Sequence, residues 1–484
     1  MKKFISILLA AIMAFSVMIP AFAENEETCD CGNAPVVIVR GLDFGGLYFN
    51  PDDAENRTPL LSVDAMGIIG AVFQALFKGI ITFNVDNAID VVFEYVGTIF
   101  DGMKMNPDGS SYYENVGPIR YPEAAGNYEE LVNGTVSEFG MVRSCIEEFG
   151  GDHTYYFTYD WRLDPFVVAD EIEATVNKAL AETGHDKVSL VCASLGGVMT
   201  VAYLTEYGYE KVERCLFMSS AFCGAQVASD LLSGKIGIDE NNLYNYLFNL
   251  VEGNGFGEFA MNALLKTGVF RFAANFGQSF TDRYEDAAYE KVLYPVFGSM
   301  LSFWGMVQAE DYDAAIEYVF GDKKEECADF IAKTQKLQDM MAGRNELISS
   351  MIDDGVKVAI VASYDTPVIP VYENSNFNGD GILETYQMSG YATIAPYGET
   401  LGDDYVAENP EYLSPDRVVD LSTAIFPEYT YIIKGSAHVA CDYGTDYSEF
   451  FVWLLSEDGD FHAGVNPDYP QFMVSGADLS LASF

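Results

Sequence analysis

The chain has 484 residues, of which 49% are hydrophobic, and its 73 acidic residues outnumber its 26 lysines and arginines to give a net charge of −47. The apolar fraction is too high for a disordered acidic protein, and the length allows one large domain with insertions. A surface this acidic repels phosphates, so we expect no nucleic-acid partner and no electrostatic docking to anionic lipid.

The first 23 residues have the pattern of a secretory signal peptide. Lys2 and Lys3 form a basic start, an apolar run covers residues 4–19, and Ala21-Phe22-Ala23 supplies the small-x-small cleavage pattern. No cysteine stands at the cleavage point, so a lipid anchor is not indicated. We therefore expect residues 24–484 to form a secreted protein, exported by a bacterium.

Eight cysteines are spread along the chain without the spacing of a disulfide scaffold. Cys29-Asp30-Cys31 is too tight for an easy mutual bridge and has no second pair that would complete a zinc site. Cys192 and Cys215 lie in apolar runs and are expected to be buried thiols. An exported chain could pair some of its cysteines, but the sequence does not indicate which ones, and it predicts no metal site.

Short β-branched runs alternate with helical patterns along the chain. The predicted strands cover residues 35–39, 153–160, 188–193, 214–218, 356–362 and 429–434, and helical spacing covers residues 165–183 and 195–207. This alternation predicts an α/β fold with a mostly parallel sheet flanked by helices. The last stretch, from Glu457, is rich in Gly, Pro and Asp and is expected to pack as irregular coil.

Two segments, at about 60–105 and 225–345, interrupt the alternation and are expected to be mainly helical cap insertions. The first contains a long apolar run at residues 65–83. Lys78 and several glycines within it argue against a membrane span. The run is either a cap helix packed on the core or a lid that opens and makes transient contact with a lipid surface.

The segment from Val188 to Met199 runs from a strand through a serine and small residues into a helix. This is the context of a nucleophile elbow, in which a serine occupies a strained turn between small neighbours. Gly196 meets that requirement, and Cys192 stands where the G-x-S-x-G pattern has its first glycine. We predict Ser194 as a nucleophile, with an ordinary strand end as the alternative.

A serine nucleophile needs a base, and the chain has four histidines. In this fold class the partners follow the serine in the order acid, then histidine, which excludes His153 and His185. His462 lies in the irregular tail, whereas His438 follows the predicted strand at 429–434 directly. His438 is therefore the predicted base.

The acid must lie between the serine and the base. Asp365 and Asp380 both follow the predicted strand at 356–362, and spacing alone does not separate them. The oxyanion needs two backbone N–H donors. We expect one on Leu195, after the nucleophile, and one on Leu42, in the glycine-rich loop after the first strand.

Five motifs follow one another along the chain: PVVIVRGLDFGG from Pro35, YDWRLDP from Tyr159, CASLGG from Cys192, NGDG from Asn378 and GSAHV from Gly435. Together they resemble the motifs of the lecithin:cholesterol acyltransferase and lysosomal phospholipase family, with Arg40 in place of the family's proline. The resemblance implies an α/β-hydrolase fold, an acyl-serine intermediate without metal or organic cofactor, and Asp380 as the acid. Trp161 and Arg162, in the second motif, form either a structural ion pair under an aromatic cap or part of an acyl or headgroup pocket.

The predicted function is that of a secreted serine-dependent lipid acyltransferase or phospholipase/esterase, acting on a lipid or ester substrate. Two alternatives stay open. One is an esterase for polysaccharide or short-chain esters, and the other is a catalytically inactive surface-binding protein on the same scaffold. The oligomeric state is not predicted.

Overall fold

The structure is a computed structural model that describes residues 29, 32–61, 100–134, 136, 138–235, 237, 240–249, 266, 289–369, 377–438, 445–459 and 461–484. The predicted signal peptide at 1–23 and the apolar run at 65–83 lie outside the described residues. No helix among the described residues combines the length and apolar character needed to cross a membrane.

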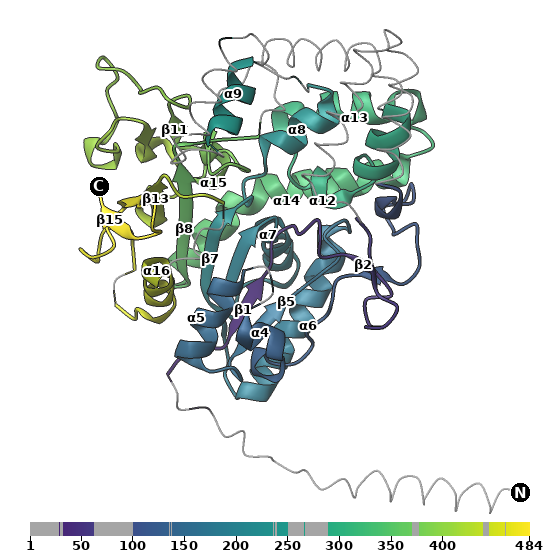
Figure 1. Ribbon diagram of the computed structural model, residues 1–484, viewed down its shortest axis with the longest axis horizontal. Coiled ribbons are helices and arrows are strands. Elements are labelled where there is room, and N and C mark those ends of the chain that lie inside the picture. The colour runs from purple at the N-terminus through teal and green to yellow at the C-terminus, as the bar shows by residue number, and fades with distance from the viewer. Residues whose placement is uncertain are drawn as a thin grey trace, which may run out of the picture.

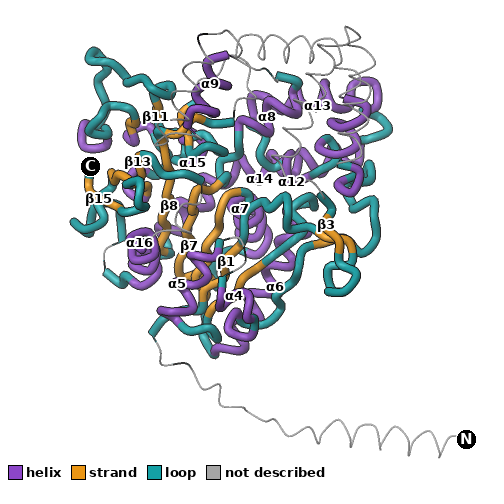
Figure 2. The backbone as a smooth tube through the Cα atoms, in the orientation of Figure 1, coloured by secondary structure: helices purple, strands orange, loops and turns teal. Residues whose placement is uncertain are grey.

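A central eight-stranded sheet organises the chain (Figures 1 and 2). In spatial order its strands are β15 (Leu481–Ser483), β14 (Phe472–Ser475), β13 (Thr430–Lys434), β8 (Lys357–Tyr364), β7 (Val212–Ser220), β6 (Val188–Ser194), β1 (Val36–Val39) and β5 (Thr154–Phe157). All neighbouring strands are parallel except β14 and β15. The predicted mostly parallel α/β architecture is therefore confirmed.

Helices cover both faces of this sheet. One face packs against α6 (Pro165–Thr183), α7 (Gly196–Tyr207) and α14 (Ala328–Asp353), and the other against α5 (Phe139–Phe149) and α16 (Thr445–Ser456). Side chains of β1 alternate between the two cores, with Val37 and Val39 in the first and Val36 and Ile38 in the second. Because both faces are covered, the strands are continuous apolar runs.

Helix α6 has the bounds that the sequence predicts, Pro165–Thr183. The Asp164 carboxylate accepts a hydrogen bond from Phe166 N at 3.0 Å, which satisfies one of the free amides of the first turn. Pro165 occupies the first helical position, where its missing N–H costs nothing. Gly184, with φ of +71°, ends the helix in the left-handed conformation that glycine adopts without strain.

The second predicted insertion forms short helices that gather at one end of the sheet in Figure 1. They are α8 (Gln226–Ser233), α9 (Glu240–Asn249), a π-helical segment at Tyr289–Phe297, α12 (Leu301–Trp304) and α13 (Ala309–Phe320). The predicted boundary at 345 needs correction, because α14 begins at Ala328 and packs against α7 and β8. It belongs to the layer that flanks the sheet.

The remaining described elements are short. They are β2 (Tyr48–Phe49), β3 (Thr58–Pro59), β4 (Val116–Gly117), α4 (Glu129–Asn133), β9 (Thr366–Pro367), β10 (Asn378–Gly379), α15 (Thr385–Met388), β11 (Thr393–Ile394) and β12 (Val419–Asp420). Single 3₁₀ turns occur at Asp101–Met103, Ala125–Asn127, Gly321–Lys323, Pro410–Tyr412, Leu421–Thr423 and Pro427–Tyr429.

The C-terminal stretch corrects another expectation. It was predicted to be irregular coil from Glu457, but β14 pairs with β13 and β15 pairs with β14 at the edge of the sheet. Gln471 leads the chain into this position, since its side-chain amide donates to the carbonyls of Pro427 and Thr430 at 2.6 and 3.0 Å. Strands of four and three residues are too short to show a period in the sequence.

Candidate active site

Ser194 is the last residue of β6 and adopts a φ of +51°, a left-handed conformation that is uncommon for a residue with a side chain. The turn into α7 is packed too tightly for larger neighbours. A Cβ on Gly196 would lie 2.5 Å from Val39 O, and a Cβ on Gly197 would lie 1.8 Å from Ser220 Oγ. The glycines after the serine therefore allow α7 to start against β1 and β7.

Cys192 occupies the position two residues before the serine. Its side chain is fully buried and its thiol donates to Leu216 O at 3.4 Å. Burial raises the pKa of this thiol to about 12, so the thiolate is strongly disfavoured. Cys215 is also fully buried, which confirms the prediction that both are buried thiols.

His438 and Asp380 form a close pair. His438 Nδ1 lies 2.6 Å from Asp380 Oδ2, and the His438 backbone N–H donates to the Asp380 carbonyl at 2.8 Å. The other carboxylate oxygen, Oδ1, accepts from the amides of Ile382 and Leu383 at 3.0 and 2.8 Å. The Asp380 side chain has no solvent exposure and that of His438 has 16%. The carboxylate is thus fixed from three directions while the imidazole keeps an accessible edge.

Asp365, the alternative acid, has different partners. It lies directly after β8 with a φ of +70°, and its carboxylate is 3.6 Å from Lys434 Nζ. Its amide donates to Asn378 Oδ1 at 2.6 Å. The structure therefore places Asp380, and not Asp365, against His438. His462 lies in the C-terminal stretch beside its neighbour's carbonyl, Ala463 O.

The sheet topology brings the serine and the His438–Asp380 pair to the same edge. Ser194 ends β6, Asp380 follows β8 through β10, and His438 comes four residues after β13. These strands are parallel, so their carboxyl ends lie on one side of the molecule, where ligands of open α/β sheets bind.

The loop after β1 crosses close to Ser194. A Cβ on Gly41 would lie only 2.8 Å from Ser194 Cβ, so this position tolerates no side chain. Leu42 is the next residue, and Leu195 follows the serine. Within the described part of the chain, neither of these two backbone amides donates to a protein acceptor. The two amides that the sequence predicts as oxyanion donors thus lie on the loop and the turn that flank the serine.

A buried polar cluster that sequence reasoning missed supports this loop. The Gly41 amide donates to Glu138 Oε1 at 2.8 Å, and the Tyr156 hydroxyl donates to Glu138 Oε2 at 2.7 Å. Arg40 is also buried, with its guanidinium 3.4 Å from the Asp43 carboxylate. Burial raises the pKa of Glu138, although Arg40 and the two hydrogen bonds oppose that shift.

One sequence signal pointed toward this cluster. An arginine directly after a buried strand needs an acidic partner if it is itself buried. Glu138 lies 97 residues from Gly41 in the chain, so no local pattern could identify it. It sits just before α5 with a φ of +54°, which is a strained conformation for glutamate.

Trp161 and Arg162 are fully buried just beyond β5. The Trp161 indole donates to Asp43 O at 2.9 Å and so fixes the loop after β1. Arg162 makes a two-pronged ion pair with Asp160, at 2.6 and 2.9 Å, and its guanidinium also donates to Ser111 Oγ at 3.1 Å. These contacts favour the structural interpretation of the pair.

A cavity of about 410 Å³ lies beside the loop after β1. Its lining includes Arg40, Tyr48, Arg57, Tyr121 and Tyr156. Trp161 and Arg162 are not among the lining residues of this cavity. Side chains suited to hold a metal ion converge elsewhere, at the opposite edge of the sheet, where Cys29, His153 and His185 meet.

No family model matches this chain, and neither does any curated protein. Among solved structures, the chain is similar to one described as the crystal structure of the Tle4-Tli4 complex, with 17% sequence identity and a TM-score of 0.19. The similarity covers 41% of this chain and 48% of the other. A TM-score this low carries no argument about fold or function.

Proposed function

We propose that the protein is a secreted serine enzyme of the α/β-hydrolase fold that transfers or hydrolyses the acyl group of a lipid ester. The observation that carries this proposal is the strained Ser194 turn, with the loop at Gly41 directly against it and His438 paired with the buried Asp380 at the same sheet edge. Strain of this kind persists only where the surrounding structure enforces it, and it is concentrated at functional sites.

The His438–Asp380 geometry supports His438 Nε2 as the base. A carboxylate can only accept hydrogen bonds, so the short contact to Asp380 holds the proton on His438 Nδ1. That leaves Nε2 unprotonated and able to take the proton of the Ser194 hydroxyl. Asp380 thereby orients the ring and stabilises the imidazolium that forms, without itself being protonated.

The reaction then follows in two balanced steps. Ser194 Oγ attacks the ester carbonyl carbon while its proton passes to His438 Nε2, and the alcohol leaves with that proton. Water in a hydrolase, or an acceptor alcohol in a transferase, then gives its proton to Nε2 and attacks the acyl carbonyl carbon. The bond between Ser194 Oγ and the acyl group breaks, the proton on Nε2 passes to Ser194 Oγ, and the free acid or the new ester leaves. The Leu42 and Leu195 amides stabilise the oxyanion of each tetrahedral intermediate.

The test of the nucleophile uses a fluorophosphonate probe, which labels activated serines covalently. Ser194→Ala should abolish labelling and ester hydrolysis. The matched control is Ser219→Ala, because Ser219 lies near the end of the neighbouring strand β7 and also has a positive φ, +42°. This control should label at the wild-type rate. Labelling that survives Ser194→Ala would overturn the assignment.

The lipid substrate class rests on the family resemblance and on the apolar run at 65–83. Residues 65–83 lie outside the described residues, so contact with a lipid surface stays a prediction. Hydrolysis of an aggregated long-chain ester should exceed that of the same ester below its aggregation threshold, with little dependence on salt. Replacing Phe73 and Phe77 by serine should remove this gain and spare a short soluble ester. Equal losses on both substrates would contradict the docking role.

A further inference from the structure

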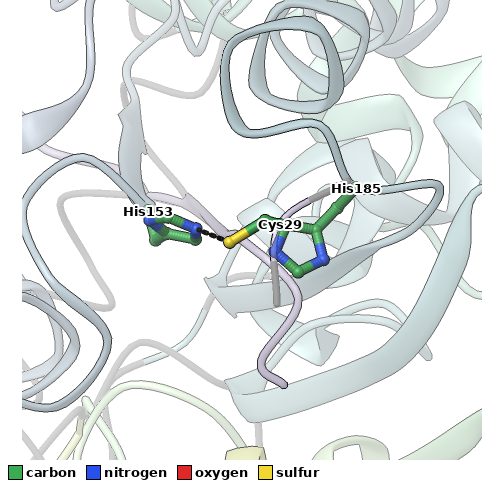
Figure 3. A group of neighbouring side chains, drawn as sticks. All are labelled: Cys29, His153 and His185. Atoms are coloured by element: carbon green, nitrogen blue, oxygen red, sulfur yellow. Dashed lines mark hydrogen bonds between the residues drawn. The ribbon is translucent and has the colours of Figure 1, made fainter. Parts of the chain in front are cut away.

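We propose that Cys29, His153 and His185 bind a zinc ion at the edge of the sheet opposite Ser194. The Cys29 sulfur and one ring nitrogen from each histidine all lie within 4.8 Å of one another (Figure 3). Figure 3 shows the Cys29 side chain between the two imidazole rings. This inference is independent of the proposed acyl-transfer chemistry.

Topology brings these three residues together from distant parts of the chain. Cys29 precedes β1, His153 directly precedes β5, and His185 lies between α6 and β6. These three strands are adjacent and parallel in the sheet, so their amino ends share one edge. The backbone is tightly connected there, since Val36 N donates to His153 O at 2.8 Å.

The distances fit a tetrahedral site. Zinc binds thiolate sulfur at about 2.3 Å and imidazole nitrogen at about 2.0–2.1 Å, which places two such ligands about 3.5 Å apart. Cys29 Sγ lies 3.6 Å from His153 Nε2. The rings of His153 and His185 meet edge to face with centroids 5.5 Å apart, and one nitrogen of each lies within 4.8 Å of the other and of the sulfur.

The surroundings of His153 also fit a metal ligand. Its Nε2 faces Cys29, while its other ring nitrogen, Nδ1, lies 3.2 Å from the Asp152 carboxylate. A carboxylate near the second ring nitrogen is a common neighbour of a metal-binding histidine. Sulfur and imidazole ligands select zinc over the oxygen-seeking cations Ca²⁺ and Mg²⁺.

The sequence expectation of no zinc site depended on the absence of a second cysteine pair near Cys29-Asp30-Cys31. The fold supplies two histidines instead, and His153 lies 124 residues after Cys29. A zinc ion here would fix residue 29 to the sheet ahead of β1. Because the ion would bind only the folded chain at this site, it would stabilise the protein.

The experiment starts with the full secreted chain, from which metal is removed with a chelator and to which Zn²⁺ alone is then returned. We expect one zinc per chain by elemental analysis and a melting temperature that falls on removal and recovers on return. With Co²⁺ in place of Zn²⁺, a thiolate-to-cobalt charge-transfer band should appear and should be missing in Cys29→Ser. His185→Gln should weaken zinc binding by more than about 100-fold. Substitutions of residues that only support a metal ligand already cost about 10–100-fold, and His185 is itself a proposed ligand.

Two histidine variants serve as matched controls. His462→Gln, in the exposed C-terminal stretch, and His438→Gln, at the candidate active site, should both keep one zinc, and the second should lose ester hydrolysis. If the wild-type chain takes up no zinc, or gives no cobalt band, the zinc proposal is wrong. The acyl-transfer proposal would be unaffected by either result. Equal zinc content in His185→Gln and His462→Gln at limiting metal would overturn it too.

Discussion

The two edges of the parallel sheet carry two different clusters of chemically reactive side chains. At the carboxyl edge, Ser194 sits in a strained turn and the His438–Asp380 pair is held by backbone amides. At the amino edge, Cys29, His153 and His185 converge from the segments that lead into β1, β5 and β6. The carboxyl edge holds the groups that we propose for proton transfer, whereas the amino edge gathers donors of the kind that hold a metal.

The four histidines of the chain lie in three different places in the fold. Because His438 follows β13, it lies at the carboxyl edge of the sheet, where it contacts the buried carboxylate of Asp380. His153 and His185, which chain order excluded as bases, lie at the other edge, and His462 lies in the C-terminal stretch. The same parallel topology therefore separates the histidine that we propose as a base from the two that we propose as zinc ligands.

The largest expected effect comes from Asp380→Asn. The amide would present an N–H to His438 Nδ1 and favour the wrong tautomer, so kcat/KM should fall by about 10⁴-fold. Steady-state kinetics on a soluble ester measure this loss. Asp365→Asn is the control, because its carboxylate faces Lys434 and should matter little. If Asp380→Asn lowered kcat/KM only slightly and Asp365→Asn lowered it severely, Asp365 would be the acid instead.

A stability effect should follow from Arg162→Gln. The change leaves the Asp160 carboxylate buried without its charged partner, which costs about 3–5 kcal/mol in the free energy of unfolding. Urea unfolding measures it. Arg143→Gln breaks an exposed ion pair with Glu147 and should change stability by at most about 0.5 kcal/mol. A stable Arg162→Gln variant with altered ester selectivity would instead support the pocket role.

Gly41→Ala tests the loop over the serine. Its added Cβ would lie 2.8 Å from Ser194 Cβ, so the loop must move and take the Leu42 amide with it. We expect kcat/KM to fall by about 10²–10³-fold, the usual cost of losing one oxyanion donor. In the same loop, a Cβ on Gly45 meets its nearest atom at 3.5 Å, so Gly45→Ala should be nearly neutral. If both changes lowered kcat/KM equally, close approach of Gly41 to Ser194 would not explain the loss.

The smallest effect concerns Glu138 and pH. Burial raises its pKa above the ordinary 4.5, so between that value and the folded pKa the native state keeps a proton that the unfolded chain has lost. The contribution of this group to stability therefore decreases as pH rises through that window. Glu138→Gln keeps an acceptor for the Gly41 amide and should flatten this decrease. Melting temperatures of both proteins from pH 4.5 upward give the difference, and identical pH profiles would contradict it.

Much of the carboxyl edge could be predicted from local sequence. The strand before Ser194, the two glycines after it and the histidine after β13 are all patterns of a few neighbouring residues. Asp380 and Asp365 could not be separated by spacing, because the choice depends on how the chain returns through β9 and β10 to place one carboxylate against His438.

The features that were missed depend on long-range contacts. Glu138 reaches the Gly41 amide from an unrelated loop, and Cys29 meets His153 only because β1 and β5 are neighbours in the sheet. The edge strand β14 was missed for another reason, since its four residues depend on pairing with β13 and carry no period of their own. The contacts of Glu138 with Gly41 and of Cys29 with His153 follow from the fold and leave no pattern in the local sequence.

If Ser194 is the nucleophile, an acyl-serine forms there during turnover and can be trapped. The wild-type chain is mixed with an activated acyl ester, quenched in acid within the first turnovers, and mapped by intact and peptide mass spectrometry. We expect an added acyl mass on the peptide that contains Ser194, absent in Ser194→Ala. Ester consumption with no acylated peptide, or acylation at a different residue, would contradict it.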